Sequence, residues 1–488
     1  MRGSPLEVAV IGGGITGLAA ANRLLELARE QGAPLPSMRL LESTSRIGGA
    51  VLTERLGEYL LEGGPDTLVA RKPGGIRLCE KLGLADRLFG VESRRSGTQV
   101  VRGGRLANLP RGFLMMAPMR LSPMLASPLF SPAGKVRMMC EFLVPPRKDP
   151  DGDESLSSFV TRRFGREVLE RAAEPIIAGL FTADAERMSL KMTMPRFLDL
   201  ERRFGSVTRG LRYAERLGKS ERAGTPRNDY GDFAALEGGL GLLIDELGRR
   251  LSPDGIQLHS RVRSVDSDPA SGRWRIRIAG SEDLEAESVI FTSPAFSIAR
   301  TLGGMDAALG DDLERIRYAS CATVNLVYRR RDIRRPLESF GFFVPRTERL
   351  PILACSFASV KFEGRVPKDK VLLRAFVGGA REPEVLDQED ERLSATVHRT
   401  LRSLLGIDGE PVLSRTYRFF QSMPQYQVGD FDLIGRIKER VFRHSGLFLA
   451  GSALGAVGLP DCIVSGEQAA AKATEFLDAR ARRFDLAI

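Results

Sequence analysis

The stretch VAVIGGGITGLAAANRL, residues 8–24, places three glycines between an apolar run and a helix-like run. Val8 to Ile11 predicts a buried strand, and Thr16 to Leu27 carries the apolar spacing of a helix. Gly12, Gly14 and Gly17 match G-x-G-x-x-G. In that motif the glycines allow a tight turn, backbone contact with a pyrophosphate, and close packing of helix on strand. The alternative is an ordinary strand-to-helix turn, because glycine-rich turns are common.

An acidic residue at the end of the next strand strengthens the nucleotide interpretation. Residues 37–43 read SMRLLES, so a second strand over Met38 to Leu41 ends in Glu42. Glu42 lies somewhat further from Gly17 than the usual spacing of about 20 residues, and the insert REQGAPLPS accounts for the excess. A carboxylate there accepts hydrogen bonds from the ribose hydroxyls of an adenosine. The two features together predict a dinucleotide site.

Composition sets limits on the function. The chain has 488 residues, 43% hydrophobic and 27% charged, which suits two or three globular domains. The net charge of +10 suggests an anionic partner. The basic residues are scattered without a nucleic-acid fingerprint, so we expect no nucleic-acid binding. A membrane surface or a carboxylate substrate fits better.

Cysteine and histidine usage argues against disulfides and metals. Five cysteines stand far apart, and three histidines show no ligand spacing. The first strand starts almost at once and no long apolar run occurs, so we expect neither a signal peptide nor a membrane-spanning helix. The expected location is the cytoplasm, with peripheral contact at the inner face of the cell membrane left open.

Two further features follow Glu42 along the chain. Arg46 precedes the glycine pair Gly48–Gly49, and the C-terminal AGSALGAVGLPDCIVSGEQAA reads as a glycine loop followed by a helix that begins near Pro460–Asp461. With these features the chain resembles the flavin amine-oxidase superfamily, which binds FAD. In that resemblance the helix N-terminus points at the flavin pyrimidine ring and stabilises its reduced form. The cofactor-binding residues that the motif and the resemblance together imply are Gly12, Gly13, Gly14, Ile15, Thr16, Gly17, Glu42, Ser43, Arg46, Gly48, Gly49, Gly63, Gly64, Pro65, Val262, Gly451, Val457, Gly458 and Leu459.

Four stretches, together with MPQYQVGD near residue 425, make the resemblance closer. They are VAVIGGGITGLAA, EPIIAGLFTADAERMSL, GFFVPR…FVGGAREPE and the C-terminal motif. With them the chain resembles the oxygen-dependent protoporphyrinogen oxidase and coproporphyrinogen III oxidase family of haem biosynthesis. The implied reaction removes six electrons from a porphyrinogen, with three O2 reduced to three H2O2. The flavin performs the transfer, so no residue is assigned a catalytic role and no metal is expected.

The resemblance also implies substrate contacts. Gly179 would face a pyrrole N–H, Phe376 would stack on the macrocycle, and Phe343 and Ser356 would flank it; Ser356 is a polar departure. Gly179 as a helix C-cap is the alternative from the residues themselves. The family's propionate-binding arginine is replaced by Thr98, and Arg95 is the candidate to take its place. Protoporphyrinogen IX is the first candidate substrate and coproporphyrinogen III the alternative.

The fold class expected is α/β: a discontinuous Rossmann-like FAD-binding domain, a mixed-sheet substrate domain and a helical subdomain of membrane-binding type. The boundaries are 1–88, 228–296 and 434–488; 89–109 and 297–433; and 110–227. In the helical part, Arg111, Arg120, Lys135, Arg137 and Arg147 punctuate short apolar runs, which fits a shallow membrane contact. Internal packing of its methionines is the alternative, and a homodimer is left open. The stretch over residues 153–181 is expected to be helical, with Asp153 or Ser155 as its N-cap.

Rival functions are another flavin amine oxidase, a carotenoid desaturase-like enzyme, or an assembly factor without turnover.

Overall fold

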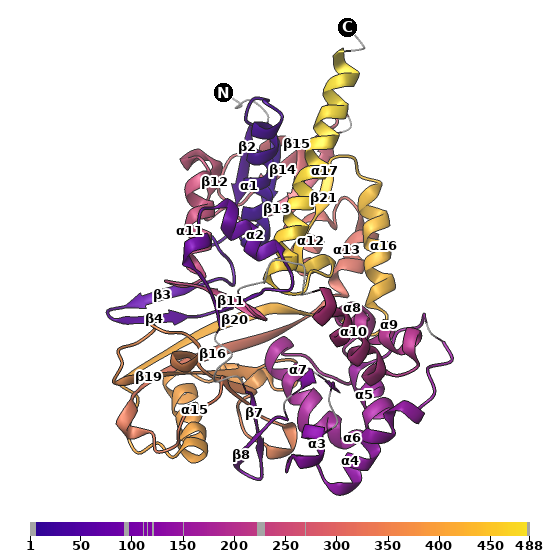
Figure 1. Ribbon diagram of the computed structural model, residues 1–488. Coiled ribbons are helices and arrows are strands. Elements are labelled where there is room, and N and C mark those ends of the chain that lie inside the picture. Colours follow the sequence, from indigo (N-terminus) through magenta and orange to yellow (C-terminus); the bar gives the residue numbers. More distant parts are fainter. Residues whose placement is uncertain are drawn as a thin grey trace.

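The computed structural model describes residues 6–91, 97–110, 112–114, 116–119, 122–149, 151–221, 230–268 and 270–485. Within these residues the chain forms two seven-stranded sheets and a helical unit (Figure 1). The fold class is therefore α/β with a discontinuous Rossmann-like domain, as predicted. Arg95, Arg111 and Arg120 lie outside the described residues.

The first sheet draws its strands from both ends and the middle of the chain. Its order is β12-β2-β1-β15-β14-β13, with β21 paired to β15. β1 pairs in parallel with β2 and β15, and β15 pairs in parallel with β21. The strands are β1 (Leu6–Ile11), β2 (Met38–Leu41), β12 (Ile256–Gln257), β13 (Val262–Asp268), β14 (Arg273–Ile278), β15 (Leu284–Phe291) and β21 (Leu447–Leu449).

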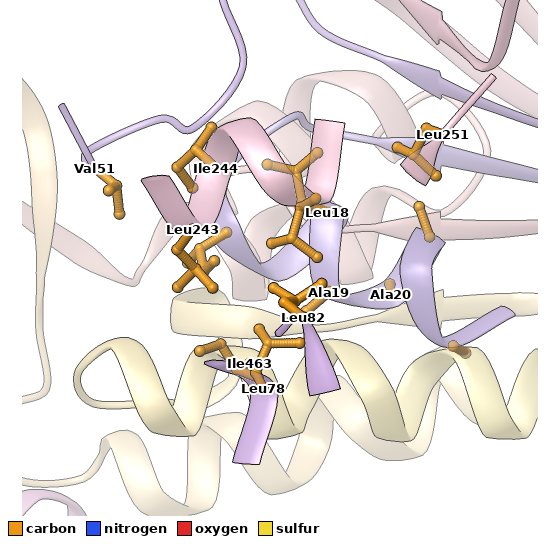
Figure 2. Close-up of a cluster of buried hydrophobic side chains, with 14 of the residues drawn as sticks. Leu18, Ala19, Ala20, Val51, Leu78, Leu82, Leu243, Ile244, Leu251 and Ile463 are labelled. Atoms are coloured by element: carbon orange, nitrogen blue, oxygen red, sulfur yellow. The ribbon is translucent and has the colours of Figure 1, made fainter. Parts of the chain in front are cut away.

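Helices cover both faces of this sheet, which explains why β1 is a continuous apolar run. One face packs on α1 (Ile15–Glu30), α2 (Gly74–Lys81), α11 (Gly241–Arg250) and α17 (Leu459–Asp485). Figure 2 shows part of this core, where Leu18, Leu243 and Ile463 come from three of these helices. The other face packs on α12 (Ala295–Leu302), α13 (Ala307–Glu314) and α16 (Asp430–Phe442).

The second sheet is mixed and has the order β20-β16-β19-β18-β17-β7-β8. Only the β17–β7 pair is parallel among its described ladders. α15 (Asp390–Leu405) packs on one face through Leu393, Val397 and Leu401. The strands are β7 (Gln99–Arg102), β8 (Arg105–Asn108), β16 (Arg317–Arg329), β17 (Gly341–Phe343), β18 (Ala354–Phe357), β19 (Lys370–Gly378) and β20 (Leu413–Gln425), and α14 (Ala358–Lys361) follows β18.

Short strands connect the two sheets. β3 (Thr53–Leu56) and β4 (Tyr59–Glu62) form a hairpin, and β11 (Phe233–Leu236) pairs with both β5 (Leu68–Val69) and β6 (Leu88–Gly90). The hairpin is followed by Gly63 and Gly64, which lie between the two large sheets. These segments therefore position one sheet relative to the other.

The helical unit has its own core of buried Phe, Leu and Met side chains. Its elements are β9 (Phe113–Leu114), β10 (Ala117–Pro118), α3 (Ser122–Ala126), α4 (Pro132–Met139), α5 (Leu156–Phe164), α6 (Arg166–Val168), α7 (Glu174–Phe181), α8 (Leu190–Thr193), α9 (Pro195–Phe204) and α10 (Val207–Glu221). Ser155 caps α5, accepting a hydrogen bond from the Ser158 N–H at 3.1 Å.

The helix expected after residue 153 is interrupted. Gly165, with φ +96°, ends α5, and a π-helical turn over Leu169–Ala173 precedes α7. Pro175 follows that turn and has no N–H to donate, so regular α-helical hydrogen bonding cannot run through it. The stretch is therefore helical, as expected, but it is divided into α5, α6, a π-helical turn and α7.

We propose one change to the expected domain boundaries. α12 and α13 bury Ile298, Leu302, Leu309 and Leu313 against the first sheet. Residues 297–316 therefore belong with the cofactor sheet rather than with the mixed sheet. The remaining expected boundaries, 1–88, 228–296 and 434–488 for the cofactor domain, 89–109 and 297–433 for the substrate domain and 110–227 for the helical unit, stay proposals apart from this shift.

Candidate flavin and substrate site

The turn between β1 and α1 has the geometry that a dinucleotide requires. Gly12 has φ +115°, and a Cβ there would lie 2.7 Å from Thr292 Oγ1. A Cβ on Gly17 would lie 1.9 Å from the Gly12 carbonyl oxygen. Gly14 differs, because a Cβ on it would meet nothing within 4 Å. The first and third glycines thus allow close packing, whereas the second borders open space at the N-terminus of α1, where a phosphate is favoured.

The C-terminal motif packs against the same turn. Gly451 has φ +88°, and a Cβ on it would lie 2.9 Å from Thr16 Oγ1. A Cβ on Gly466 would lie 2.2 Å from the Thr16 carbonyl oxygen. α17 begins at Leu459, directly after Val457 and Gly458, so its N-terminus lies beside that of α1 (Figure 1). Two helix N-termini therefore meet at this crevice, a favourable field for an anionic cofactor. Ile15, like Thr16, is buried in the first turn of α1.

Glu42 reaches the fingerprint turn from the end of β2. Its Oε2 accepts the Gly13 N–H at 2.8 Å and its Oε1 accepts the Thr44 N–H at 2.8 Å. The Ser43 hydroxyl donates to the same Oε1 at 3.3 Å. The Ser260 N–H donates to the Glu42 carbonyl at 2.7 Å, and Val262 begins β13 two residues later. Glu42 and the start of β13 at Val262 therefore lie near each other at the edge of this crevice.

Arg46 supports the second glycine pair. Its guanidinium donates to the carbonyls of Gly49 at 2.5 Å, Ile47 at 3.2 Å and Val51 at 3.3 Å. The Gly48 N–H donates to the Gly13 carbonyl at 2.7 Å, and a Cβ on Gly49 would lie 3.2 Å from Gly14 Cα. Burial lowers the pKa of the Arg46 guanidinium, which nevertheless remains charged. The 48–49 turn is therefore stacked on the fingerprint turn.

The turn at Gly63 and Gly64 joins the crevice to the mixed sheet. A Cβ on Gly64 would lie 1.7 Å from the Ala50 carbonyl oxygen, and Pro65 follows directly. On its other side, a Cβ on Gly63 would lie 2.9 Å from the Tyr417 ring. The glycines therefore allow a backbone approach on both sides. The 63–64 turn therefore contacts both the cofactor crevice and the mixed sheet.

Three of the predicted substrate residues lie together: Phe343, Phe376 and Gly179. Phe343, Ala354 and Phe376 pair across β17, β18 and β19 and so occupy one row on one sheet face. A Cβ on Gly179 in α7 would lie 2.5 Å from Phe343 Cδ1, so α7 packs directly on this row. Ser356 lies on the same face, two residues beyond Ala354, and its buried Oγ has no hydrogen-bond partner among the described residues.

Gly179 does not cap its helix, so that alternative interpretation was wrong. α7 continues to Phe181, and Thr182 ends it with φ +52°. The Thr182 N–H donates to the Ala178 carbonyl at 3.0 Å, which satisfies one carbonyl at the end of the helix. The small size of Gly179 allows its contact with Phe343.

Thr98, which replaces the family's arginine, lies just before β7. Its carbonyl accepts a hydrogen bond from the Leu109 N–H at 2.8 Å.

An open groove of about 790 Å³ lies between the helical unit and the mixed sheet. It is lined by charged residues that include Glu174, Arg346, Arg349 and Arg381. Burial raises the pKa of Glu174, although Arg381 opposes the shift. Phe343 and Phe376 do not line this groove, so it is distinct from the aromatic row.

The sequence analysis did not predict a cluster of buried charges behind the 63–64 turn. Asp66 pairs with Lys361 at 2.9 Å and with Arg374 at 3.3 Å. Burial would raise the pKa of Asp66, but the two cations outweigh that effect and lower it to about 2. Burial raises the pKa of the neighbouring Glu62, against the opposing charge of Arg365. The available signal was the arginine inside the apolar strand VLLRAFVGG, because a buried charge requires partners.

These residues fit an FAD. The open space at Gly14, the two helix N-termini and the Glu42 carboxylate suit a diphosphate and an adenosine ribose. Among the described residues, no cluster of His, Cys, Asp and Glu could hold a metal ion. No described helix has the length and apolarity needed to cross a bilayer. The fold and the site define a flavin-dependent oxidoreductase.

Comparison with known proteins agrees. The profile of the family described as "Flavin containing amine oxidoreductase" matches residues 15–474, so the chain belongs to this family and binds FAD. The coproporphyrinogen III oxidase of Bacillus subtilis (strain 168) is 31% identical over 96% of this chain and 98% of its own length. Protoporphyrinogen oxidase 2 of Arabidopsis thaliana, chloroplastic/mitochondrial, is 28% identical over 97% and 94%.

A solved structure is similar throughout. A crystal structure from Exiguobacterium sp. 255-15, provisionally named a protoporphyrinogen oxidase, has a TM-score of 0.83 at 30% identity. It covers 98% of this chain and is itself covered completely. The resemblance inferred from motifs is therefore confirmed. The roles of the individual site residues stay predictions.

Proposed function

We propose that the protein oxidises a porphyrinogen to the corresponding porphyrin. The observation that carries the proposal is the aromatic row Phe343–Ala354–Phe376, in a chain similar to porphyrinogen oxidases along its whole length. α7 contacts the row at Phe343, and the Arg374 side chain joins Phe376 to the 63–64 turn. A flat macrocycle suits an apolar aromatic face. Bound FAD would supply the two-electron chemistry, with O2 as the final electron acceptor.

The protein's own part is positioning. The Phe376 and Phe343 rings would hold the macrocycle by stacking, and Gly179 would let it approach α7. α7 contacts Phe343 at one end of the row and would shield that end from water during the transfer. Three rounds of two-electron oxidation remove six electrons and six protons from the porphyrinogen and reduce three O2 to three H2O2.

We favour coproporphyrinogen III over protoporphyrinogen IX as the preferred substrate. Similarity supports this choice, since the bacterial coproporphyrinogen III oxidases are 31–32% identical and the plant protoporphyrinogen oxidases 26–28%. Protoporphyrinogen IX stays the second candidate.

Anaerobic mixing tests the proposal. FAD-loaded protein is mixed with coproporphyrinogen III, protoporphyrinogen IX or putrescine, and bleaching of the visible flavin absorbance is followed. We expect both porphyrinogens to bleach the flavin, the first with a kcat/KM about tenfold higher, a difference of about 1.4 kcal/mol. Admission of air should yield three H2O2 per porphyrin. Bleaching by putrescine alone would make the protein an amine oxidase, and no bleaching by any of the three would leave an assembly factor.

We also propose peripheral membrane contact through the helical unit. Met116, Met124 and Met138 are buried, so internal packing accounts for these methionines. Large apolar side chains nearby are nevertheless exposed; they are Leu125, Val136, Phe142 and Leu143. Such side chains among basic residues favour shallow insertion into an anionic surface. Co-sedimentation with anionic vesicles at low salt is expected, and Leu143→Asp together with Phe142→Asp should reduce it; unchanged binding by that variant would place the contact elsewhere.

A further inference from the structure

Arg374 is a buried cation in the middle of β19. Its side chain is 3% exposed, and its strand neighbours Leu373 and Ala375 are fully buried. A guanidinium in such surroundings is costly unless its donors are satisfied. Arg374 therefore requires specific partners, and those partners indicate its role.

The partners of Arg374 belong to the turn that precedes β5. Its Nη2 donates to the Gly63 carbonyl at 3.0 Å and also to the Gly64 carbonyl. Its Nη1 donates to Asp66 Oδ2 at 3.3 Å, and the Thr323 hydroxyl donates to the Gly63 carbonyl at 2.8 Å. Two strands of the mixed sheet therefore hold the carbonyl side of this turn.

Fixing these carbonyls also fixes the opposite side of the turn. In a trans peptide the C=O and the following N–H point in opposite directions. A Gly63 carbonyl that points at the sheet therefore turns the Gly64 N–H away from it. Among the described residues this N–H has no hydrogen-bond partner. Gly64 lies on Ala50, which follows the 48–49 turn stacked on Gly14, so the free donor belongs to the cofactor crevice.

Arg374 also touches the aromatic row. Its guanidinium lies over the Phe376 ring, 4.8 Å from the centroid, a cation–π contact. One side chain thus contacts both the cofactor turn and the aromatic residue expected to hold the substrate. We propose that Arg374 is a positioning residue, which presents the Gly64 N–H to an acceptor on the flavin ring and sets Phe376 beside it. The inference rests on FAD binding in the crevice and not on the identity of the substrate.

Two substitutions and one control test this role without any porphyrinogen. Arg374→Met removes the donors, and Arg374→Lys keeps the charge beside Asp66 but cannot satisfy two carbonyls in a planar fork. Arg415→Met is the control, because Arg415 lies in the same cross-strand row on the same sheet face, pairs with Glu54 at the surface and does not touch the turn. The measurements are the FAD dissociation constant, the visible flavin spectrum and the flavin midpoint potential determined with reference dyes.

We expect Arg374→Met to raise the FAD dissociation constant about tenfold or more, because a mispositioned donor loses a hydrogen bond of about 1.5 kcal/mol. Both Arg374 variants should shift the flavin spectrum and midpoint potential, whereas Arg415→Met should match the wild type. If Arg374→Met does not fold, Thr323→Val, which removes only the hydroxyl contact, should give smaller changes in the same direction.

Two results would overturn the inference. One is a set of folded Arg374 or Thr323 variants whose flavin affinity, spectrum and potential all equal those of the wild type. The other is a lowered melting temperature with unchanged flavin properties below it, which would make Arg374 purely structural. Failure of the proposed function shows differently: the wild-type flavin would then resist bleaching by porphyrinogens while these flavin properties still respond to Arg374.

Discussion

Replacing Gly14 with valine tests whether the open space at the N-terminus of α1 belongs to the cofactor. Gly14 has φ −72° and ψ 179°, an extended conformation that any residue adopts, and a Cβ there meets no atom within 4 Å. The FAD-free variant should therefore fold, losing at most about 1 kcal/mol through poorer helix capping. The valine methyl groups would instead occupy the space predicted for the pyrophosphate.

The effect on FAD binding follows from the hydrogen bonds that a displaced phosphate loses. Each bond from a backbone N–H to a charged oxygen contributes about 1.5–3 kcal/mol. Losing two of them costs about 3–6 kcal/mol, which raises the FAD dissociation constant about 10²- to 10⁴-fold. The assay is flavin absorbance retained after gel filtration, followed by titration of the FAD-free protein with FAD. Thermal unfolding of the FAD-free protein is measured in parallel.

Two other glycines provide matched controls. Gly304 also borders open space with an ordinary φ but lies outside the crevice, so Gly304→Val should keep wild-type FAD affinity. Gly17→Ala places a Cβ 1.9 Å from the Gly12 carbonyl oxygen, and such overpacking costs about 1–3 kcal/mol even without FAD. If Gly14→Val folds and still binds FAD as tightly as the wild type, the open space is not the pyrophosphate site and the reasoning fails.

Three further predictions concern pH and packing. The pKa of Asp66 is lowered from 3.8 to about 2, so its ionised form stabilises the fold by about 2 kcal/mol above pH 4, and this contribution disappears as the pH falls from about 4 to 2. Urea unfolding should show that Asp66→Asn is less stable than the wild type at pH 6, with a difference in unfolding free energy that narrows toward pH 3. A difference that stays constant with pH would contradict the ion pairing. Gly179→Ala should raise the KM for a porphyrinogen about tenfold and leave the FAD affinity unchanged, since its Cβ would displace Phe343. An unchanged KM in steady-state kinetics would show that Gly179 does not contribute to substrate binding. Gly165→Ala should lower the free energy of unfolding by about 1–3 kcal/mol, because φ +96° strains any L-residue, and unaltered urea unfolding would contradict that strain.

Local patterns were sufficient for the cofactor half of the molecule. The strand at residues 8–11, the helix after it and the acid at Glu42 are encoded by short runs whose geometry depends on nearby residues. Glycine at positions 12 and 17 reports backbone approaches that only a residue without Cβ allows. The full-length family resemblance extended this to the return of the chain near residue 450.

The limits of sequence reasoning appear where partners are distant in the chain. The break at Gly165 and the π-helical turn before Pro175 were missed because an amphipathic pattern continues through both. For Gly179 the sequence left a helix cap and a substrate contact open. The structure excluded the cap because α7 continues to Phe181 and ends at Thr182, and it placed Gly179 on Phe343, 164 positions later in the chain.

The sequence by itself determined that the chain builds a dinucleotide crevice, because glycine spacing and apolar periodicity act within a few turns of backbone. Its resemblance to a known family then assigned it to the flavin enzymes. Only the tertiary structure decided which side chains of the mixed sheet hold the turn beside that crevice. Arg374 and its acceptors Gly63 and Gly64 are about 310 positions apart, and hydrogen bonds between strands so distant have no local pattern. A buried charge can be recognised in a sequence, but its partner is chosen by the fold.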